Sequence, residues 1–235
     1  MPFSAITSFR SLSVPMQLET QRLILRDWHP TEDARHAMDI FGDSRVMTWV
    51  EGSSKDTSIR QIQGRLQCYQ DLTNDTKDKT HSWAIVQKDI GRVIGHIILT
   101  VLPDLKKVRK DVTDSDMKTV DPEGMPTDYV EIGWHFRPAS WGYGYATEAA
   151  YCIAQYAFDT LALPVLLSIS DPLNLRSVGV MKRLGMRYDG ITTRYYRGAE
   201  MVLYKLTPAD LFEAQARRAS ELEFLAALNQ LEQQA

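Results

Sequence analysis

The sequence predicts an α/β fold of mixed α+β type, in which helices flank one central sheet that is mixed but mostly antiparallel. Between residues 130 and 170, an apolar segment, a glycine-containing loop, an alanine-rich helical pattern and a second apolar segment follow one another. A strand–helix–strand unit crosses over and places its two strands parallel. The strands expected at 83–86 and 93–99 are joined through Lys88-Asp89-Ile90-Gly91, which predicts an antiparallel hairpin.

The loop between the first parallel strand and its helix has features of a phosphate site. Val130–Phe136 is apolar, β-branched and aromatic, and Pro138 ends the strand because proline has no N–H for the ladder. A helix start presents unpaired N–H groups and a positive dipole end, which together attract a phosphate. Gly142 and Gly144 remove side chains that would hold a phosphate off the backbone. A tight turn into a helix explains the two glycines equally well.

The dinucleotide-binding fingerprint is not met at this loop. Thr147 occupies the place of its third glycine, and no acidic residue follows a second strand at the expected distance. This argues against a plain nucleotide-binding domain.

Two motifs follow each other along the chain. The first is Trp141-Gly142-Tyr143-Gly144-Tyr145-Ala146-Thr147-Glu148-Ala149, and the second is Asn174-Leu175-Arg176-Ser177 with an apolar helix ending Leu184-Gly185-Met186. Together they resemble the GCN5-related N-acetyltransferases, the GNAT superfamily, and the first has the form used by its RimJ/RimL-type branch. Trp141 departs from the Gln or Arg of the general family pattern. The resemblance covers about Leu18 to Leu206.

The resemblance implies an acetyl-CoA-dependent N-acetyltransferase that uses no metal. In the family, the two parallel strands splay apart, the pantetheine arm pairs with the exposed backbone of the first strand, and the pyrophosphate rests on the loop and helix start. The implied cofactor-binding residues are Trp134, Phe136, Trp141, Gly142, Tyr143, Gly144, Tyr145, Ala146, Thr147 and Asn174. A helix cap would by itself explain the asparagine.

Acyl transfer to an amine needs a base for the amine and an acid for the departing thiolate. Glu131 is the candidate base, because it lies on the strand near the thioester position that the resemblance implies and because burial can raise the pKa of a carboxylate toward neutrality. A salt bridge or a hydrogen bond across the sheet explains it about as well. His135 lies on the same strand face and is expected to be structural. The resemblance implies Ser177 as the acid. The tyrosine that serves many wider-family members is replaced by Met181.

The acceptor is left open by the sequence. The resemblance places the acceptor site beside the first two helices, so Met47, Trp49, Val50 and Glu51 are candidate contacts, although a packed loop explains each of them separately. A protein N-terminus, a polyamine, an aminoglycoside or an amino acid would each suit the family. The alternative from another class is a non-catalytic acyl-CoA-binding or sensing module with the same fold.

Composition limits the remaining possibilities. The chain has 235 residues and a net charge of −3, which does not favour nucleic acid as a partner. Cys68 and Cys152 lie on helical patterns and are expected to be small buried residues rather than a disulfide or metal ligands. We expect a cytoplasmic protein, since the first residues show neither a signal peptide nor a membrane span.

The expected organisation is a flexible arm at 1–16, an acetyltransferase domain at 17–206 and a helical extension at 207–235. Within the domain we expect one strand at 18–26 that carries Arg22 and Arg26 on one face, helices at 34–41 and 57–72, and a surface insertion at 103–128. Two antiparallel strands follow at 188–196 and 199–206. Thr207-Pro208-Ala209-Asp210 then starts a helix, whose apolar face we expect to dock on the domain, with a homodimer through other surfaces left open.

Overall fold

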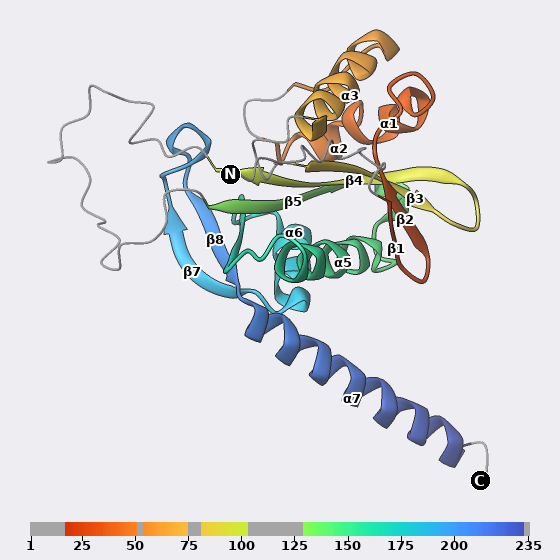
Figure 1. Ribbon diagram of the computed structural model, residues 1–235, viewed down its shortest axis with the longest axis vertical. Helices are drawn as coiled ribbons and strands as arrows, with labels where there is room; N and C mark the ends of the chain where they lie inside the picture. Colours follow the sequence, from red (N-terminus) through yellow and green to blue (C-terminus); the bar gives the residue numbers. More distant parts are fainter. Residues whose placement is uncertain (1–16, 51–53, 75–80, 103–128, 233–235) are drawn as a thin grey trace, which may run out of the picture.

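One eight-stranded sheet organises the protein (Figure 1), in a computed structural model that describes residues 17–50, 54–74, 81–102 and 129–232. The spatial order of the strands is β1-β2-β3-β4-β5-β6-β8-β7. Neighbouring strands pair antiparallel except β5 and β6, which run parallel. The strands are β1 (Leu18–Glu19), β2 (Leu23–Arg26), β3 (His81–Gln87), β4 (Arg92–Val101), β5 (Val130–Phe136), β6 (Leu166–Ser170), β7 (Arg187–Thr192) and β8 (Met201–Leu206).

Helices cover both faces of the sheet, as Figure 1 shows. One face carries α1 (Ala34–Phe41), α2 (Ser44–Met47) and α3 (Ile59–Asn74), and the other carries α5 (Tyr145–Asp159) and α6 (Leu175–Leu184). Two 3₁₀ turns, η2 (Pro138–Ser140) and η3 (Tyr196–Gly198), lie in connections, and α7 (Pro208–Glu232) follows the last strand. The predicted fold class is therefore confirmed.

Alternation along β5 divides its side chains between two cores. Val130, Ile132 and Phe136 join the cluster that packs against α5. Glu131 and His135 point to the opposite face, because successive residues of a strand alternate. On that face α1, α2 and α3 pack over β3 and β4 around the fully buried Trp28.

The parallel pair is joined over only a short distance. Val130 pairs with Leu166 and Glu131 with Leu167, and no further pair connects the two strands. From Ile132 onward β5 continues beside β4, while β6 continues beside β8. The strands therefore splay apart beyond Glu131 and leave backbone edges of β5 and β6 without a sheet partner.

The predicted glycine loop and helix are present at the end of β5. Gly142 and Gly144 adopt left-handed φ values of 87° and 80°, which glycine reaches without steric cost. Trp141 fixes the entry to the loop, since its indole Nε1 donates to the carbonyl of Phe136 at 2.8 Å. The helix then buries the alanine-rich face expected from the sequence, as Ala149, Ala150, Ile153, Ala154 and Ala157 are buried.

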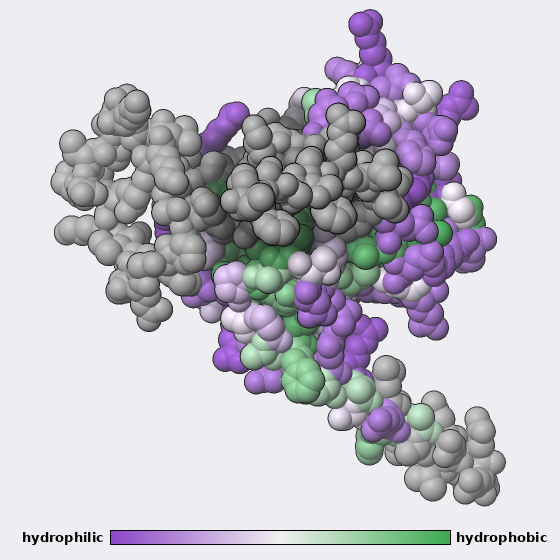
Figure 2. Space-filling view, in the orientation of Figure 1, coloured by the Kyte–Doolittle hydropathy of each residue, from purple (hydrophilic) through white to green (hydrophobic). Residues whose placement is uncertain are grey.

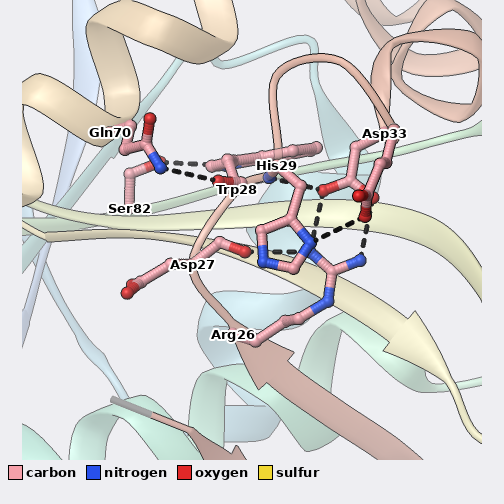
Figure 3. Close-up of polar contacts among 8 residues, drawn as sticks. Arg26, Asp27, Trp28, His29, Asp33, Gln70 and Ser82 are labelled. Carbon is pink, nitrogen blue, oxygen red and sulfur yellow. Dashed lines mark hydrogen bonds and ion pairs between the residues drawn. The ribbon is translucent and has the colours of Figure 1, made fainter. Parts of the chain in front are cut away.

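The expected single strand at 18–26 is wrong, because the chain turns within it. The N–H of Thr20 donates to the carbonyl of Leu23, and β1 folds back on β2 as an antiparallel pair. The turn also separates the two arginines that were expected on one face. Arg22 pairs with Glu148 of α5, whereas Arg26 makes two hydrogen bonds to the buried Asp33 before α1 (Figure 3). Both arginines are nevertheless paired with carboxylates.

Two further expectations need correction. Cys68 is exposed, because it lies about 200° around α3 from the buried Leu66 at 100° per residue. The strands expected at 188–196 and 199–206 are shorter, and a 3₁₀ turn separates them. The predicted arm at 1–16 and insertion at 103–128 lie outside the described residues.

The C-terminal helix docks on the domain only through its first turns. Leu211 and Ala214 are buried, and a Cβ added to Gly185 would stand 2.6 Å from the Cβ of Ala214. The helix starts where it was expected, and Thr207 and Asp210 cap it reciprocally, each accepting from the other's backbone N–H. Beyond these turns α7 projects away from the sheet (Figure 1), and apolar surface continues from the domain onto its base (Figure 2), where Phe212 is 71 % exposed. The docking prediction therefore holds for the start of the helix and is wrong for its projecting part.

Candidate active site

A cavity of about 650 Å³ occupies the gap between the diverging strands β5 and β6. Its walls come from the end of α2, from β4, β5 and β6, from the glycine loop, and from the first turns of α5 and α6. Residues from both sheet faces line it, since Trp134 and Phe136 point toward α5 while Glu131 and His135 point toward α2. The cavity therefore passes through the sheet and connects the glycine loop with the α1–α3 side.

Glu131 lies where the two strands part. Its carboxylate is 4 % exposed, and Oε1 accepts from the backbone N–H of Ile169 on β6 at 3.3 Å. The hydroxyl of Tyr196 donates to Oε2 at 2.5 Å. Burial raises the pKa of Glu131 to about 7, although both hydrogen bonds act in the opposite direction by stabilising the carboxylate. A carboxyl group with this pKa exchanges its proton near neutral pH, as a general base must.

Tyr196 is a site residue that sequence reasoning missed. It lies in η3, 65 residues from Glu131, and lines the cavity opposite β5. Tyr196 and Arg197 both adopt left-handed φ values, 49° and 58°, which are uncommon for residues with a side chain. The only local signal was the tight turn at Gly198 between two strands, and this does not indicate where the phenol points.

At the glycine loop, the cavity is lined by the N-terminus of α5 and by the side chains of two arginines. Gly142 and Gly144 line it together with the first residues of α5, and added Cβ atoms at the two glycines would meet little of the protein. Arg183 donates to the hydroxyl of the buried Thr147 at 3.1 Å, and the guanidinium of Arg176 lies 4.7 Å from the ring centre of Trp141. A helix N-terminus flanked by two arginines is suited to bind a phosphate group.

Nearly all sequence-predicted site residues meet at this one cavity. Its lining includes Glu131, Trp134, Phe136, Trp141, Gly142, Gly144, Tyr145, Ala146, Thr147, Asn174 and Ser177. Tyr143 does not line it: its side chain is 63 % exposed and stacks on Tyr145, while its carbonyl oxygen accepts from Arg22 at 3.0 Å. Tyr143 therefore contributes to the shape of the loop, and the structure does not bring its side chain to the cavity.

The start of α6 supplies the other wall. Asn174 caps the helix, since its Oδ1 accepts from the N–H of Ser177 at 3.2 Å. Both residues line the cavity, so capping does not exclude contact with a ligand. Met181, one turn further along, is completely buried in the core. It therefore cannot replace the tyrosine of the wider family.

The side of the cavity nearest α2 is largely apolar. Trp49 and Val50, two of the expected acceptor contacts, line it together with Val46. Met47 points into the α1–α3 core at 4 % exposure and does not line the cavity, which corrects that expectation. Glu51 lies outside the described residues.

His135 lines the cavity and is also held by the protein. Its Nδ1 lies 3.2 Å from Nδ1 of His96, the residue directly opposite on β4. Burial and the positive charge of Arg65 lower the pKa of His135 to about 4. The ring is therefore neutral at physiological pH. This contact is consistent with the structural role expected for His135.

A sequence model described as "Acetyltransferase (GNAT) domain" matches residues 22–187. The chain belongs to the GNAT acetyltransferase family. The Bacillus subtilis protein named "Uncharacterized N-acetyltransferase YnaD" is 26 % identical over 176 residues, which cover 74 % of this chain and 85 % of that protein. The match thus extends over most of both chains.

Solved structures share the GNAT fold. An acetyltransferase from Agrobacterium tumefaciens is 27 % identical with a TM-score of 0.59, and the match covers 83 % of this chain and 95 % of that one. Mycobacterium smegmatis RimJ in complex with CoA-disulfide is 16 % identical with a TM-score of 0.60, covering 80 % and 83 %. At that identity the second similarity shows the fold alone.

Membership of the family makes this chain an acyltransferase. GNAT enzymes use acetyl-CoA as the acyl donor and an amine as the acceptor. Within the described ranges, no group of three or more His, Cys, Asp and Glu side chains is arranged to hold a metal ion. Among the same residues, no helix has the length and hydropathy needed to cross a membrane.

Proposed function

We propose that this GNAT protein transfers the acetyl group of acetyl-CoA to a primary amine at the cavity between β5 and β6. The observation that carries the proposal is the position of Glu131. A buried carboxyl group with a pKa of about 7 lies where the strands part, in a cavity that also reaches the start of α5. A protein that only binds acyl-CoA would need the loop but no such titrating group.

Acetyl-CoA would bind with its pyrophosphate against the first turn of α5. The N–H groups around Tyr145, Ala146 and Thr147 have no partner within the helix, and the positive end of the helix dipole lies there. The pantetheine arm would run back along β5 beyond Glu131, where the ladder to β6 has stopped. Backbone groups of β5 left without a sheet partner can then pair with its amides.

The chemistry requires three proton transfers. Ionised Glu131, directly or through a water, takes one proton of the ammonium group so that the nitrogen lone pair can attack the thioester carbonyl carbon. The nitrogen of the tetrahedral intermediate then loses a second proton to water. As the intermediate collapses to the amide, the C–S bond breaks and the electron pair stays on sulfur. Ser177 donates a proton to this thiolate and regains one from solvent. The products are the acetylated amine and the free thiol.

We place the catalytic unit in residues 17–206 and treat 207–235 as an extension. The motif from Trp141 to Ala149 supports placement in the RimJ/RimL-type branch. The acceptor is the primary amine of a protein N-terminus or of a small molecule, and Trp49 and Val50 form the apolar wall of its entrance.

Replacing Ala146 by Asp tests acetyl-CoA binding at the helix start. Aspartate is well tolerated in the first turn of a helix, so folding should be preserved. Its carboxylate would stand where the pyrophosphate is expected and would repel it, since Ala146 lines the cavity. We expect calorimetry to show at least a tenfold weaker affinity for acetyl-CoA.

Ala209→Asp is the matched control. It makes the same change at an exposed position in the first turn of α7 and does not line the cavity. The control should bind acetyl-CoA as the parent does. Equal affinity of the folded Ala146→Asp protein and the parent would contradict the assignment.

A further inference from the structure

A line of buried polar groups connects the α1–α3 core to the cavity. The indole Nε1 of Trp28 donates to Oγ of Ser82 at 3.2 Å, a contact drawn in Figure 3. Oγ of Ser82 lies 2.9 Å from Nε2 of His96, and Nδ1 of His96 lies 3.2 Å from Nδ1 of His135. Trp28, Ser82 and His96 are each at most 1 % exposed. The line therefore ends at His135, its one member that lines the cavity.

The chemistry of the first members sets the direction of the hydrogen bonds. An indole N–H can only donate, so the Ser82 oxygen accepts from Trp28 and its own hydrogen is free to donate to Nε2 of His96. A neutral His96 then carries its hydrogen on Nδ1 and donates to Nδ1 of His135. If His96 donated to Ser82 instead, the hydroxyl hydrogen of the buried Ser82 would have no acceptor among the contacts of its Oγ in the described residues.

Both imidazoles are neutral, which this direction requires. Burial, the neighbouring His135 and the charge of Arg65 lower the pKa of His96 well below its usual value. Burial and Arg65 likewise lower the pKa of His135 to about 4. A neutral His135 that accepts at Nδ1 must carry its single hydrogen on Nε2.

The Nε2–H group of His135 faces the cavity. In an imidazole ring the two N–H directions diverge widely, so a ring whose Nδ1 points at β4 directs Nε2 away from that strand. On the other side of β5 lies the gap to β6. The residue is partly exposed, and its Nε2 is not one of the buried polar atoms that lack a partner in the described part of the chain. It is therefore accessible from the cavity.

We propose that His135 is a fixed neutral hydrogen-bond donor that selects amine acceptors bearing a carbonyl or carboxylate oxygen. This inference rests on the proposed function, since it assigns a substrate class to the same cavity. Glu131 and His135 share one face of β5 and are four residues apart, about 13 Å along the strand. The carboxyl group serves the amine end of the acceptor and the imidazole holds an oxygen further along it. Ser82 and His96 are positioning residues, because they act only through His135.

The tautomer can be measured without any turnover. Nitrogen-15 NMR of histidine-labelled full-length protein at neutral pH distinguishes protonated from unprotonated ring nitrogens, and a His135→Asn spectrum assigns the signals of this residue. We expect hydrogen on Nε2 of His135 and on Nδ1 of His96. Hydrogen on Nδ1 of His135 would overturn the proposal, because Nε2 would then be an acceptor.

A pair of variants separates the donor from the rest of the ring. The amide of Asn reaches about as far as Nδ1, so His135→Asn can keep the contact to His96 while removing the donor in the cavity. The amide of Gln reaches about as far as Nε2, so His135→Gln keeps an N–H group there. The probes are ω-amino carboxamides of increasing chain length, each compared with the alkylamine of equal length.

The parent should favour the carboxamide of at least one pair, as judged by kcat/KM. His135→Asn should reduce this preference about tenfold, mainly through KM for the amine, and His135→Gln should retain most of it. Two results would overturn the proposed selectivity and leave the proposed function intact. One is a parent that acetylates the carboxamide and the alkylamine of every pair equally. The other is an equal loss of the preference in His135→Asn and His135→Gln. A parent that acetylates no amine in the panel would instead fail the proposed function and the selectivity with it.

Discussion

The hydroxyl of Tyr196 donates a hydrogen bond to the carboxylate of Glu131, although 65 residues separate them. The backbone N–H of Ile169 holds the other carboxylate oxygen from across the gap between the strands. Both donors favour the ionised carboxylate, whereas burial favours the protonated acid. Burial prevails, and the pKa of Glu131 is raised to about 7.

Replacing Tyr196 by Phe should move the acid limb of the pH–rate profile to higher pH. The substitution removes a hydrogen bond that lowers the pKa of Glu131, while burial continues to raise it. Less of the carboxylate is then ionised at neutral pH. The measurement is kcat/KM for an amine acceptor between pH 5 and 9, and an acid limb at the parent's position would show that Tyr196 does not tune Glu131.

The same titration should appear in the stability of the protein. The pKa of Glu131 is about 7 in the folded protein and 4.5, the ordinary glutamate value, in the unfolded chain, so between these values the folded state binds more protons. Stability from this group is complete below pH 4.5 and is lost as pH rises through about 7. The difference between the two pKa values corresponds to roughly 3 kcal/mol.

Thermal melts of the parent and Glu131→Gln from pH 5 to 8 measure this contribution. The glutamine variant cannot ionise, so its stability relative to the parent should rise from pH 5 to about 7 and then level off. A constant difference in melting temperature from pH 5 upward would mean that folding does not raise the pKa of the carboxyl group. The comparison needs no substrate and is independent of the acetyltransferase assay.

Much of the site followed from local sequence patterns. The strand at Val130–Phe136, the left-handed glycines of the loop and the alanine-rich helix are specified by neighbouring residues, and the structure has all three. The strand–helix–strand crossover predicted that the strand at 165–170 runs parallel to the first, and β6 does. Glu131 could be singled out because it lies on the first of these strands, near the thioester position that the family resemblance implies.

Contacts between distant segments could not be obtained in this way. The phenol of Tyr196 reaches Glu131 from the β7–β8 connection, where Tyr196 and Arg197 take left-handed backbone angles. At the turn between β1 and β2, Arg22 pairs with Glu148 of α5, a contact that no local pattern encodes. Cys68 was misplaced because a helical pattern does not by itself say which face is buried.

Truncation of α7 should separate its docked turns from its projecting part. Ending the chain after Leu206 removes Leu211, whose burial is worth roughly 2 kcal/mol, and exposes the apolar surface that it covers. Ending it after Ser220 keeps these turns, and the melting temperature should stay near that of the full chain. The protein that ends after Ser220 therefore serves as the control for the one that ends after Leu206. Equal melting temperatures for all three proteins would mean that the first turns of α7 contribute no stability.

Replacing Ser177 by Ala should lower kcat by roughly tenfold, less than a well-positioned acid usually contributes, because water can protonate the thiolate instead. The backbone N–H that Asn174 caps is kept in this variant. The defect should shrink with thioester donors whose thiol is more acidic, since such thiolates leave without an acid. An equal defect with every donor would assign Ser177 a structural role.

The pH dependence of kcat/KM for the amine in the parent and Glu131→Gln tests the central claim most directly. In the parent we expect an acid limb with a midpoint near 7, the pKa of Glu131. The variant should be slower by about 10²–10⁴-fold at neutral pH, lack this limb, and approach the parent only at high pH, where the amine loses its proton unaided. Acetyl-CoA affinity should be unchanged. An acid limb near pH 7 that persists in the glutamine variant, with activity close to the parent's, would contradict Glu131 as the base.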